Sequence, residues 1–147
     1  MSVALVKPLA IAKNEGIEQV EAAMLNLPQI ECKVSHHFGP GIYIREITMP
    51  AGSFVMGHSH KDKNLNVMLT GKIVMRKNGE IDTICAPFIF TAEPGRKLAY
   101  VVEECVWQNI YATEETNIEK LDDMFIDKSD TWLEYEKECA ELLVGAK

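Results

Sequence analysis

Residues 52–64 read GSFVMGHSHKDKN, and the next glycine in the chain is Gly71. This stretch places a histidine pair between glycines in a β-rich sequence, and the rest of the chain is arranged around it. Alternate side chains of a strand share a face. We therefore expect one row of four side chains, formed by Phe54, Met56, His58 and His60. If a hairpin follows, Asn64 at the start of the next strand faces the same interior.

Two imidazoles and an amide at the end of this row allow two interpretations. They can hold a divalent metal ion, with His58, His60 and Asn64 as ligands. An amide oxygen carries no charge, however, and binds such a cation less well than a carboxylate does. Alternatively, the same side chains form hydrogen bonds in a polar pocket. The sequence alone leaves both interpretations open.

The spacing of these residues resembles the first motif of the cupins, in which a glycine, His-x-His, Glu and a second glycine follow one another. Gly52, the two histidines and Gly71 match that motif, whereas Asn64 replaces the Glu. Other stretches resemble small cupin proteins encoded in bacteriophage genomes and prophages, namely residues 36–52, 86–88, 93–97, 106–107 and 112–117. The resemblance implies a mainly β fold, a cupin barrel of the double-stranded β-helix or jelly-roll type. It implies no particular reaction.

Two departures from the cupin pattern weaken a metal site. In metal-binding cupins the second motif supplies a histidine after a proline and a glycine, but residues 94–98 read PGRKL. In the phage-type sequences a histidine often ends the last strand, where this chain has Tyr111. If a metal binds, the resemblance implies Zn, Fe, Mn or Ni in a weakened site, with isomerase, lyase or dioxygenase chemistry.

Short β-rich runs separated by Gly, Pro and Asn fill the middle of the chain. This spacing, without a helical pattern between the runs, predicts a β-sandwich or barrel. Asn78-Gly79 suits a type I′ hairpin, because both residues tolerate positive φ. The runs cover residues 32–38, 42–49, 53–58, 65–69, 72–76, 81–85, 88–91, 98–102 and 106–111.

Helical patterns flank the expected barrel. Asn14 can cap a helix over residues 15–27, and Pro28 ends it. After residue 113 the chain becomes acidic, with one helix expected over 118–124 and another over 131–144. We therefore expect a single domain made of three parts: an N-terminal arm and helix (1–29), the barrel (30–113) and a C-terminal helical segment that packs on the barrel (114–147).

Strand alternation also selects candidate pocket residues. His36 and His37 are neighbours on one strand, so only one of them faces inward, and we select His37. Arg45 either faces inward as an anchor for a carboxylate or phosphate, or lies at the surface in an ion pair. An aromatic–amide–phenol row on the last strand either lines a ligand pocket or belongs to the core. The predicted pocket consists of His37, Arg45, Met56, Trp107, Asn109 and Tyr111.

The composition excludes several classes of partner. The chain of 147 residues has a formal net charge of -7, which disfavours nucleic acid, because phosphate binding needs clustered Lys and Arg. No apolar run is long enough to cross a bilayer, and the first residues lack the features of a signal peptide. We therefore expect no membrane association and a cytoplasmic location, in the host cytoplasm if the protein is phage-encoded. The four cysteines are expected to be reduced thiols.

Three hypotheses about function follow. The leading one is a small homodimeric cupin-fold protein whose barrel pocket binds a small polar ligand, with no reaction assigned. The second is a divalent-metal-dependent enzyme that uses His58 and His60. The third is a non-catalytic dimeric scaffold or interaction protein of phage type. Strands that are apolar on both faces, such as residues 65–69, need a cover from the terminal segments or from a second subunit.

Overall fold

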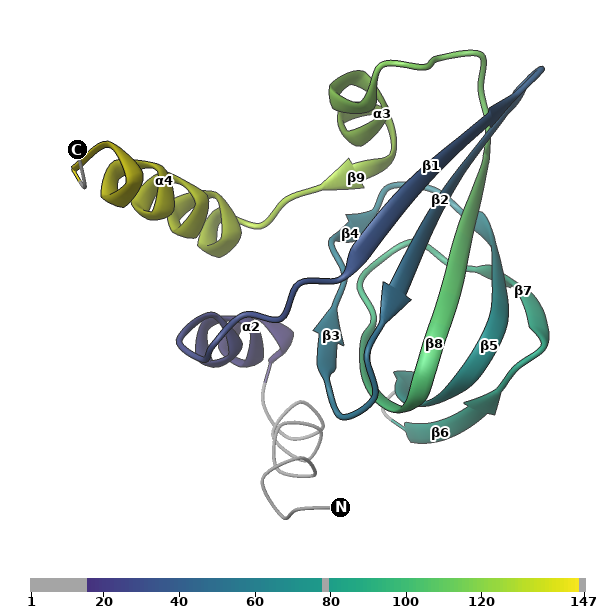
Figure 1. Ribbon diagram of the computed structural model, residues 1–147, viewed down its shortest axis with the longest axis horizontal. Helices are drawn as coiled ribbons and strands as arrows, with labels where there is room; N and C mark the ends of the chain where they lie inside the picture. Colours follow the sequence, from purple (N-terminus) through teal and green to yellow (C-terminus); the bar gives the residue numbers. More distant parts are fainter. Residues whose placement is uncertain (1–15, 78–79, 146–147) are drawn as a thin grey trace.

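The computed structural model describes residues 16–77 and 80–145, so the predicted cap at Asn14 and the turn at Asn78-Gly79 lie outside the described residues. Seven antiparallel strands form a sheet that curves into a barrel (Figure 1). Its order is β1-β2-β8-β5-β6, while β3 pairs with β8 and β7 pairs with β5. These strands are β1 (Lys33–Gly39), β2 (Ile42–Met49), β3 (Phe54–Met56), β5 (Asn64–Lys77), β6 (Glu80–Cys85), β7 (Phe88–Ala92) and β8 (Leu98–Ala112). A separate pair consists of β4 (Ser59–His60) and β9 (Ile126–Asp127).

The two longest strands, β5 and β8, are paired with each other. Each spans two of the predicted runs, because β5 has 14 residues and β8 has 15. Gly71, which we expected to separate two strands, is instead a site of irregular register within β5 and has a φ of 97°. A Cβ atom at Gly71 would lie 2.7 Å from the Cα of Cys105 on β8. The close approach of the two strands therefore requires glycine there.

Helices lie before and after the barrel in sequence, as predicted: α2 (Ile17–Leu25), α3 (Ile118–Phe125) and α4 (Asp130–Gly145). α2 is shorter than expected, and its N-cap residue is Gly16, which has no side chain that could cap the helix. The side chains of Asn117 and Ser129 cap α3 and α4, each accepting a hydrogen bond of 3.1 Å from a backbone N–H in the first turn. Within the described residues, none of the helices has both the length and the apolar character needed to span a membrane.

The C-terminal segment is buried against the barrel mainly through its first part. Leu121 of α3 is 1% exposed and packs with Tyr43 and Tyr111. α4 has no fully buried side chain and extends away from the barrel (Figure 1). Leu142 and Leu143 are 73% and 75% exposed, although their pattern predicted packing positions. Within the described residues, α3 and β9 supply the buried contacts of this segment with the barrel, and α4 adds the edge-on contact of Trp132 with His58.

The core lies inside the barrel and is built mainly from β2, β5 and β8. Its buried residues are Met49, Met68, Ile73, Met75, Ala99, Val101, Cys105 and Trp107. Val55 of β3 packs against this core, whereas Phe54 and Met56 pack in the cluster that includes α2. The single row expected for Phe54, Met56, His58 and His60 does not form. The strand is interrupted between β3 and β4, so the alternation does not continue through His58.

Candidate functional site

Three rows of side chains cross the inner surface of the sheet. Residues paired between antiparallel strands lie side by side on one face, so the register of β1, β2, β8 and β5 determines each row. The polar row consists of His36, Arg45, Asn109 and Asn66. An apolar row lies on one side of it, formed by Val34, Ile47, Trp107 and Met68. An aromatic row lies on the other side, formed by Phe38, Tyr43 and Tyr111.

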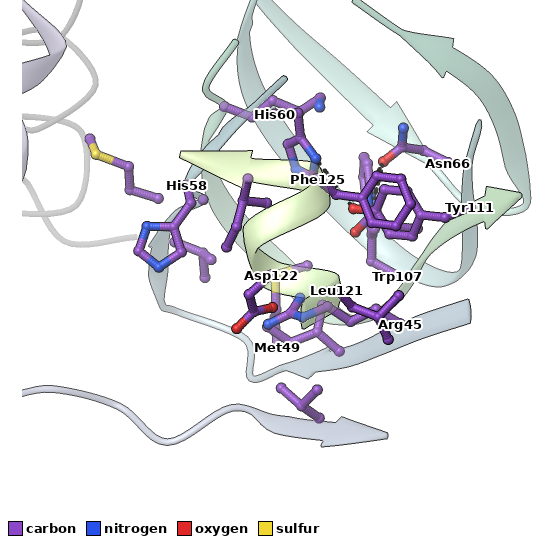
Figure 2. A pocket seen from close by; sticks show the side chains of 18 of the residues that line it. Arg45, Met49, His58, His60, Asn66, Trp107, Tyr111, Leu121, Asp122 and Phe125 are labelled. Carbon is purple, nitrogen blue, oxygen red and sulfur yellow. Dashed lines mark hydrogen bonds between the residues drawn. The ribbon is translucent and has the colours of Figure 1, made fainter. Parts of the chain in front are cut away.

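All members of these rows except Phe38 and Met68 line a cavity of about 440 Å³ inside the barrel. Its apolar part continues into the core through Met49 and Met75. The segment of α3 and β9 also lines it, with Leu121, Asp122 and Phe125 among the contributing side chains (Figure 2). Because β9 pairs with β4, this segment is joined to the strand that carries His60. The cavity is thus formed by residues that are far apart in the sequence.

Most of the predicted site residues line this cavity: Arg45, Met56, His58, His60, Trp107, Asn109 and Tyr111. The prediction for His37 is corrected, because its side chain is 53% exposed and its Nε2 lies 3.8 Å from Glu46 Oε1. His36 lines the cavity instead, with its Nδ1 2.8 Å from the Tyr43 hydroxyl. The register explains the difference, since the turn between β1 and β2 pairs His36 with Arg45.

Three asparagines and Trp107 form a buried hydrogen-bonded network beside Arg45. Trp107 Nε1 donates to Asn66 Oδ1 at 2.9 Å, and Asn109 Nδ2 donates to the same oxygen at 2.6 Å. Asn64 Oδ1 accepts from Asn66 Nδ2 at 2.6 Å and from Asn109 Nδ2 at 3.2 Å. Both lone pairs of the Asn64 side-chain oxygen are therefore in use.

The donor set does not fit the divalent metal predicted for His58, His60 and Asn64. Asn64 belongs to the amide network and is not among the residues that line the cavity. His60 Nδ1 lies 3.3 Å from the Tyr111 hydroxyl. Among the described residues, no group of three or more His, Cys, Asp or Glu side chains could hold a metal ion. Cationic side chains near His60 would also repel a metal cation.

The cavity carries an excess of positive charge, although the chain as a whole has a net charge of -7. Arg45, Lys97 and Lys128 line it, and Asp122 is the one acidic residue among the described lining residues. Lys128 Nζ lies 3.2 Å from Glu136 Oε1. The side chains of Arg45 and Lys97 form no ion pair or hydrogen bond with any described residue.

Burial and these cations lower the pKa values of three residues that line the cavity. Burial lowers the pKa of His60 from 6.5 to about 4, and the positive charges of Lys97, Arg45 and His58 act in the same direction. Burial, followed by the charge of Lys128, lowers the pKa of His58. Burial also lowers the pKa of Lys97. Both imidazoles are therefore uncharged at neutral pH, and the site disfavours added positive charge.

His58 lies near the contacts that α2 and α4 make with the barrel. Its Nδ1 atom is buried and has no hydrogen-bond partner within the described residues. Its ring lies edge-on to Trp132 of α4, with 5.1 Å between the ring centroids. The preceding Gly57 carbonyl accepts a hydrogen bond of 3.0 Å from Arg96, whose guanidinium pairs with the buried Glu21 of α2 at 2.5 Å. These contacts hold His58 at the edge of the cavity.

Sequence reasoning missed Asn66, Lys97 and Asp122 as cavity residues. Asn66 carried a usable signal, because it is two residues from Asn64 and therefore on the same face of the strand. Lys97 directly precedes β8, and Asp122 lies on α3. Tertiary packing brings these residues into one cavity, and local sequence periodicity does not predict such packing.

Comparisons with known proteins give only distant similarities. No protein-family model matches the chain, and no curated protein matches it. Among solved structures, it is similar to an uncharacterized conserved protein with a double-stranded β-helix domain from Klebsiella pneumoniae. That similarity has 16% identity and a TM-score of 0.49, and it covers 65% of this chain and 90% of the other.

Two further solved structures show similarity at the same level. For an RmlC-like cupin family protein from Methanocaldococcus jannaschii the identity is 13%, the TM-score is 0.46, and the coverage is 63% of this chain and 86% of the other. For an HTH_3 family transcriptional regulator from Vibrio cholerae the identity is 21% and the TM-score is 0.45. The match covers 57% of this chain and 52% of that regulator, so the chain spans about half of its length.

Proposed function

We propose that the barrel cavity binds a small organic anion, most simply a carboxylate. The observation that carries this proposal is the pair of cationic side chains, Arg45 and Lys97, which line the cavity without a partner among the described residues. Asp122, the one acidic residue among the described lining residues, forms no ion pair with either of them. A partly buried cation without a paired counter-ion is unfavourable, because burial removes hydration and nothing replaces it. A ligand carboxylate supplies the missing charge, and an arginine can hold it through two parallel hydrogen bonds.

The titration of the histidines supports the same proposal. The pKa of His60 is lowered by burial and by Lys97, Arg45 and His58, so the surroundings of this ring disfavour a proton. An anion bound among these groups reverses the electrostatic part of that effect. A bound divalent cation would add to it. The charges in the cavity therefore favour an anionic ligand over a metal cation.

The rest of the cavity indicates a ligand that is only partly polar. Met49, Met75 and Trp107 form an apolar part of the cavity beside the polar row. The cavity volume of about 440 Å³ lies within the range of about 300–1,000 Å³ that is typical of small-molecule sites. We therefore expect a compact molecule with one anionic end and an apolar body.

The proposal is tested by calorimetric titration with benzoate and with its uncharged isostere benzamide. We expect benzoate to bind and benzamide to bind at least about tenfold more weakly, because charge-assisted hydrogen bonds are about twice as strong as neutral ones. Arg45→Gln should reduce this difference, because Lys97 then remains as the one cation of the proposed pair. Arg76→Gln is the matched control, because Arg76 does not line the cavity. Equal binding of the two compounds, or no binding of either, contradicts the proposal.

A second copy of the chain is a further candidate partner, favoured by the outer face of the barrel. Several large apolar side chains on neighbouring strands are exposed there, among them Ile42 (47%), Leu65 (40%), Leu69 (44%) and Ile89 (66%). An apolar face of this kind is typical of a subunit interface. We expect a homodimer in light-scattering measurements, and we expect Leu65→Glu together with Ile89→Glu to produce a monomer. A monomeric unmodified protein rejects this part of the proposal.

A further inference from the structure

The amide network beside Arg45 has a fixed direction, set by Trp107. An indole N–H can only donate a hydrogen bond, so the Asn66 side-chain atom 2.9 Å from Trp107 Nε1 must be the oxygen. The Asn66 nitrogen therefore points the other way. It donates to the backbone oxygen of Asn64 at 3.1 Å and to its side-chain oxygen at 2.6 Å. Both N–H groups of Asn66 are then in use.

The same constraint fixes the orientation of Asn109. Its side-chain nitrogen donates to Asn66 Oδ1 at 2.6 Å and to Asn64 Oδ1 at 3.2 Å. Each of those two oxygens accepts two hydrogen bonds, and a reversed Asn109 would place oxygen against oxygen at both. The Asn109 carbonyl oxygen is thus left over. No described residue donates a hydrogen bond to it, and Asn109 lines the cavity.

The free oxygen of Asn109 lies next to the proposed anion site. Asn109 and Arg45 are directly paired between β8 and β2, and both line the cavity. The Cβ atoms of such a pair are about 4.5–5.5 Å apart. A ligand with its carboxylate at Arg45 therefore has the adjoining part of its skeleton beside the Asn109 oxygen. That oxygen is an acceptor, so a ligand that matches the site brings a hydrogen-bond donor.

We infer that the preferred ligand is a 2-hydroxycarboxylate with an apolar substituent. This inference rests on the proposed function and refines it. The carboxylate meets Arg45 and Lys97, the hydroxyl on the adjacent carbon donates to Asn109 Oδ1, and the substituent meets the apolar row that contains Trp107. An ammonium group in place of the hydroxyl also donates, but its positive charge is unfavourable beside Arg45 and Lys97.

Calorimetric titration of the unmodified protein with three acids tests the inference. Phenylacetate has the carboxylate and the apolar ring, mandelate adds the 2-hydroxyl, and 2-methoxy-2-phenylacetate keeps the oxygen but cannot donate. We expect mandelate, in at least one enantiomer, to bind about tenfold more tightly than the other two acids. 2-Phenylglycine should also bind more weakly than mandelate.

The outcomes separate this inference from the proposed function. If the acids bind with equal affinity, or if the methoxy compound binds as tightly as mandelate, the donor preference is wrong and the anion site stands. If none of the acids binds, both fail. If phenylglycine binds more tightly than mandelate, the hydroxyl assignment is wrong.

Two variants show whether the network is the source of the preference. Asn109→Leu removes the acceptor, and Trp107→Phe removes the donor that fixes the direction of the amides. Each should reduce the preference for mandelate over phenylacetate to less than about twofold, and near-ultraviolet circular dichroism checks that each variant is folded. Gln108→Leu is the matched control, because Gln108 points away from the cavity and donates to Glu46 at 2.8 Å. A preference that persists in folded Asn109→Leu overturns the inference.

Discussion

Replacement of Lys97 by methionine should change stability and ligand binding in opposite directions. Lys97 directly precedes β8, lines the cavity, and has no ion pair among the described residues. Burial lowers the pKa of its ammonium group, which means that the charged form is disfavoured where it lies. Methionine keeps a similar unbranched length and removes the charge. The substitution therefore removes an unfavourable charge from the free protein and an attractive charge from the complex.

The expected magnitudes follow from the partial burial of Lys97. An unpaired polar group costs about 1–3 kcal/mol when buried, and solvent near a half-buried ammonium group reduces this to about 1 kcal/mol. For a chain of this size that gain raises the melting temperature by about 2–4 °C. In the complex, loss of one charge-assisted hydrogen bond weakens benzoate binding by about tenfold to a hundredfold.

Calorimetric melting and benzoate titration of the same preparation measure both effects. Lys63→Met is the matched control, because Lys63 is 64% exposed and its Nζ lies 3.3 Å from Glu93 Oε1 at the surface. A surface pair of this kind contributes about 0–1 kcal/mol, and we expect benzoate affinity to be unchanged. A destabilised Lys97→Met protein, or one that binds benzoate as tightly as the unmodified protein, refutes the reasoning.

Three further predictions concern the stability of the fold. Glu21→Ala leaves the Arg96 guanidinium buried without its partner and should lower the unfolding free energy in urea by about 3–5 kcal/mol. Because burial and neighbouring cations hold the pKa of His60 at about 4, below its ordinary 6.5, the unfolded chain binds a proton more readily between these values. Stability should therefore fall as the pH falls from 6.5 towards 4, and His60→Gln should reduce that fall. Gly71→Ala places a Cβ 2.7 Å from the Cys105 Cα at a φ of 97° and should cost at least about 2 kcal/mol in thermal unfolding.

Each of these predictions has a control within the chain. Glu18→Ala changes an exposed acid on the same helix as Glu21, and equal effects of the two variants would mean that the buried ion pair does not stabilise the fold. His37→Gln changes an exposed histidine, and equal effects of the two histidine variants would mean that His60 is not the source of the pH dependence. Gly39→Ala meets no atom within 4 Å, so a similar loss for Gly39 and Gly71 would contradict the steric argument.

The strands were predictable from sequence because β-rich runs alternate with Gly, Pro and Asn, whereas their continuity was not. Gly71 reads as a break, yet the two long strands approach so closely there that a glycine keeps β5 continuous. The helix α4 shows the opposite case. Its apolar residues have the spacing of a packing face, but Leu142 and Leu143 remain exposed because no described part of the chain covers them.

The candidate site was predictable only where a single strand defines it. Trp107, Asn109 and Tyr111 alternate along β8, and all three line the cavity. The choice between His36 and His37 required the register of the β1–β2 hairpin, which the turn sets and local alternation does not. Asn64 has the sequence position of a metal ligand, but its side-chain oxygen accepts hydrogen bonds from neighbouring amides of β5 and β8.

NMR titration of the histidine ring protons can detect an anion bound beside the positive charges of the cavity. The chain has four histidines, so His→Gln variants suffice to assign the signals. We expect a His60 pKa near 4 in the free protein and a rise of at least about one pH unit with saturating benzoate, because the bound carboxylate favours the protonated ring. A His60 pKa that does not move when benzoate is added, or one already near 6.5 in the free protein, would contradict it.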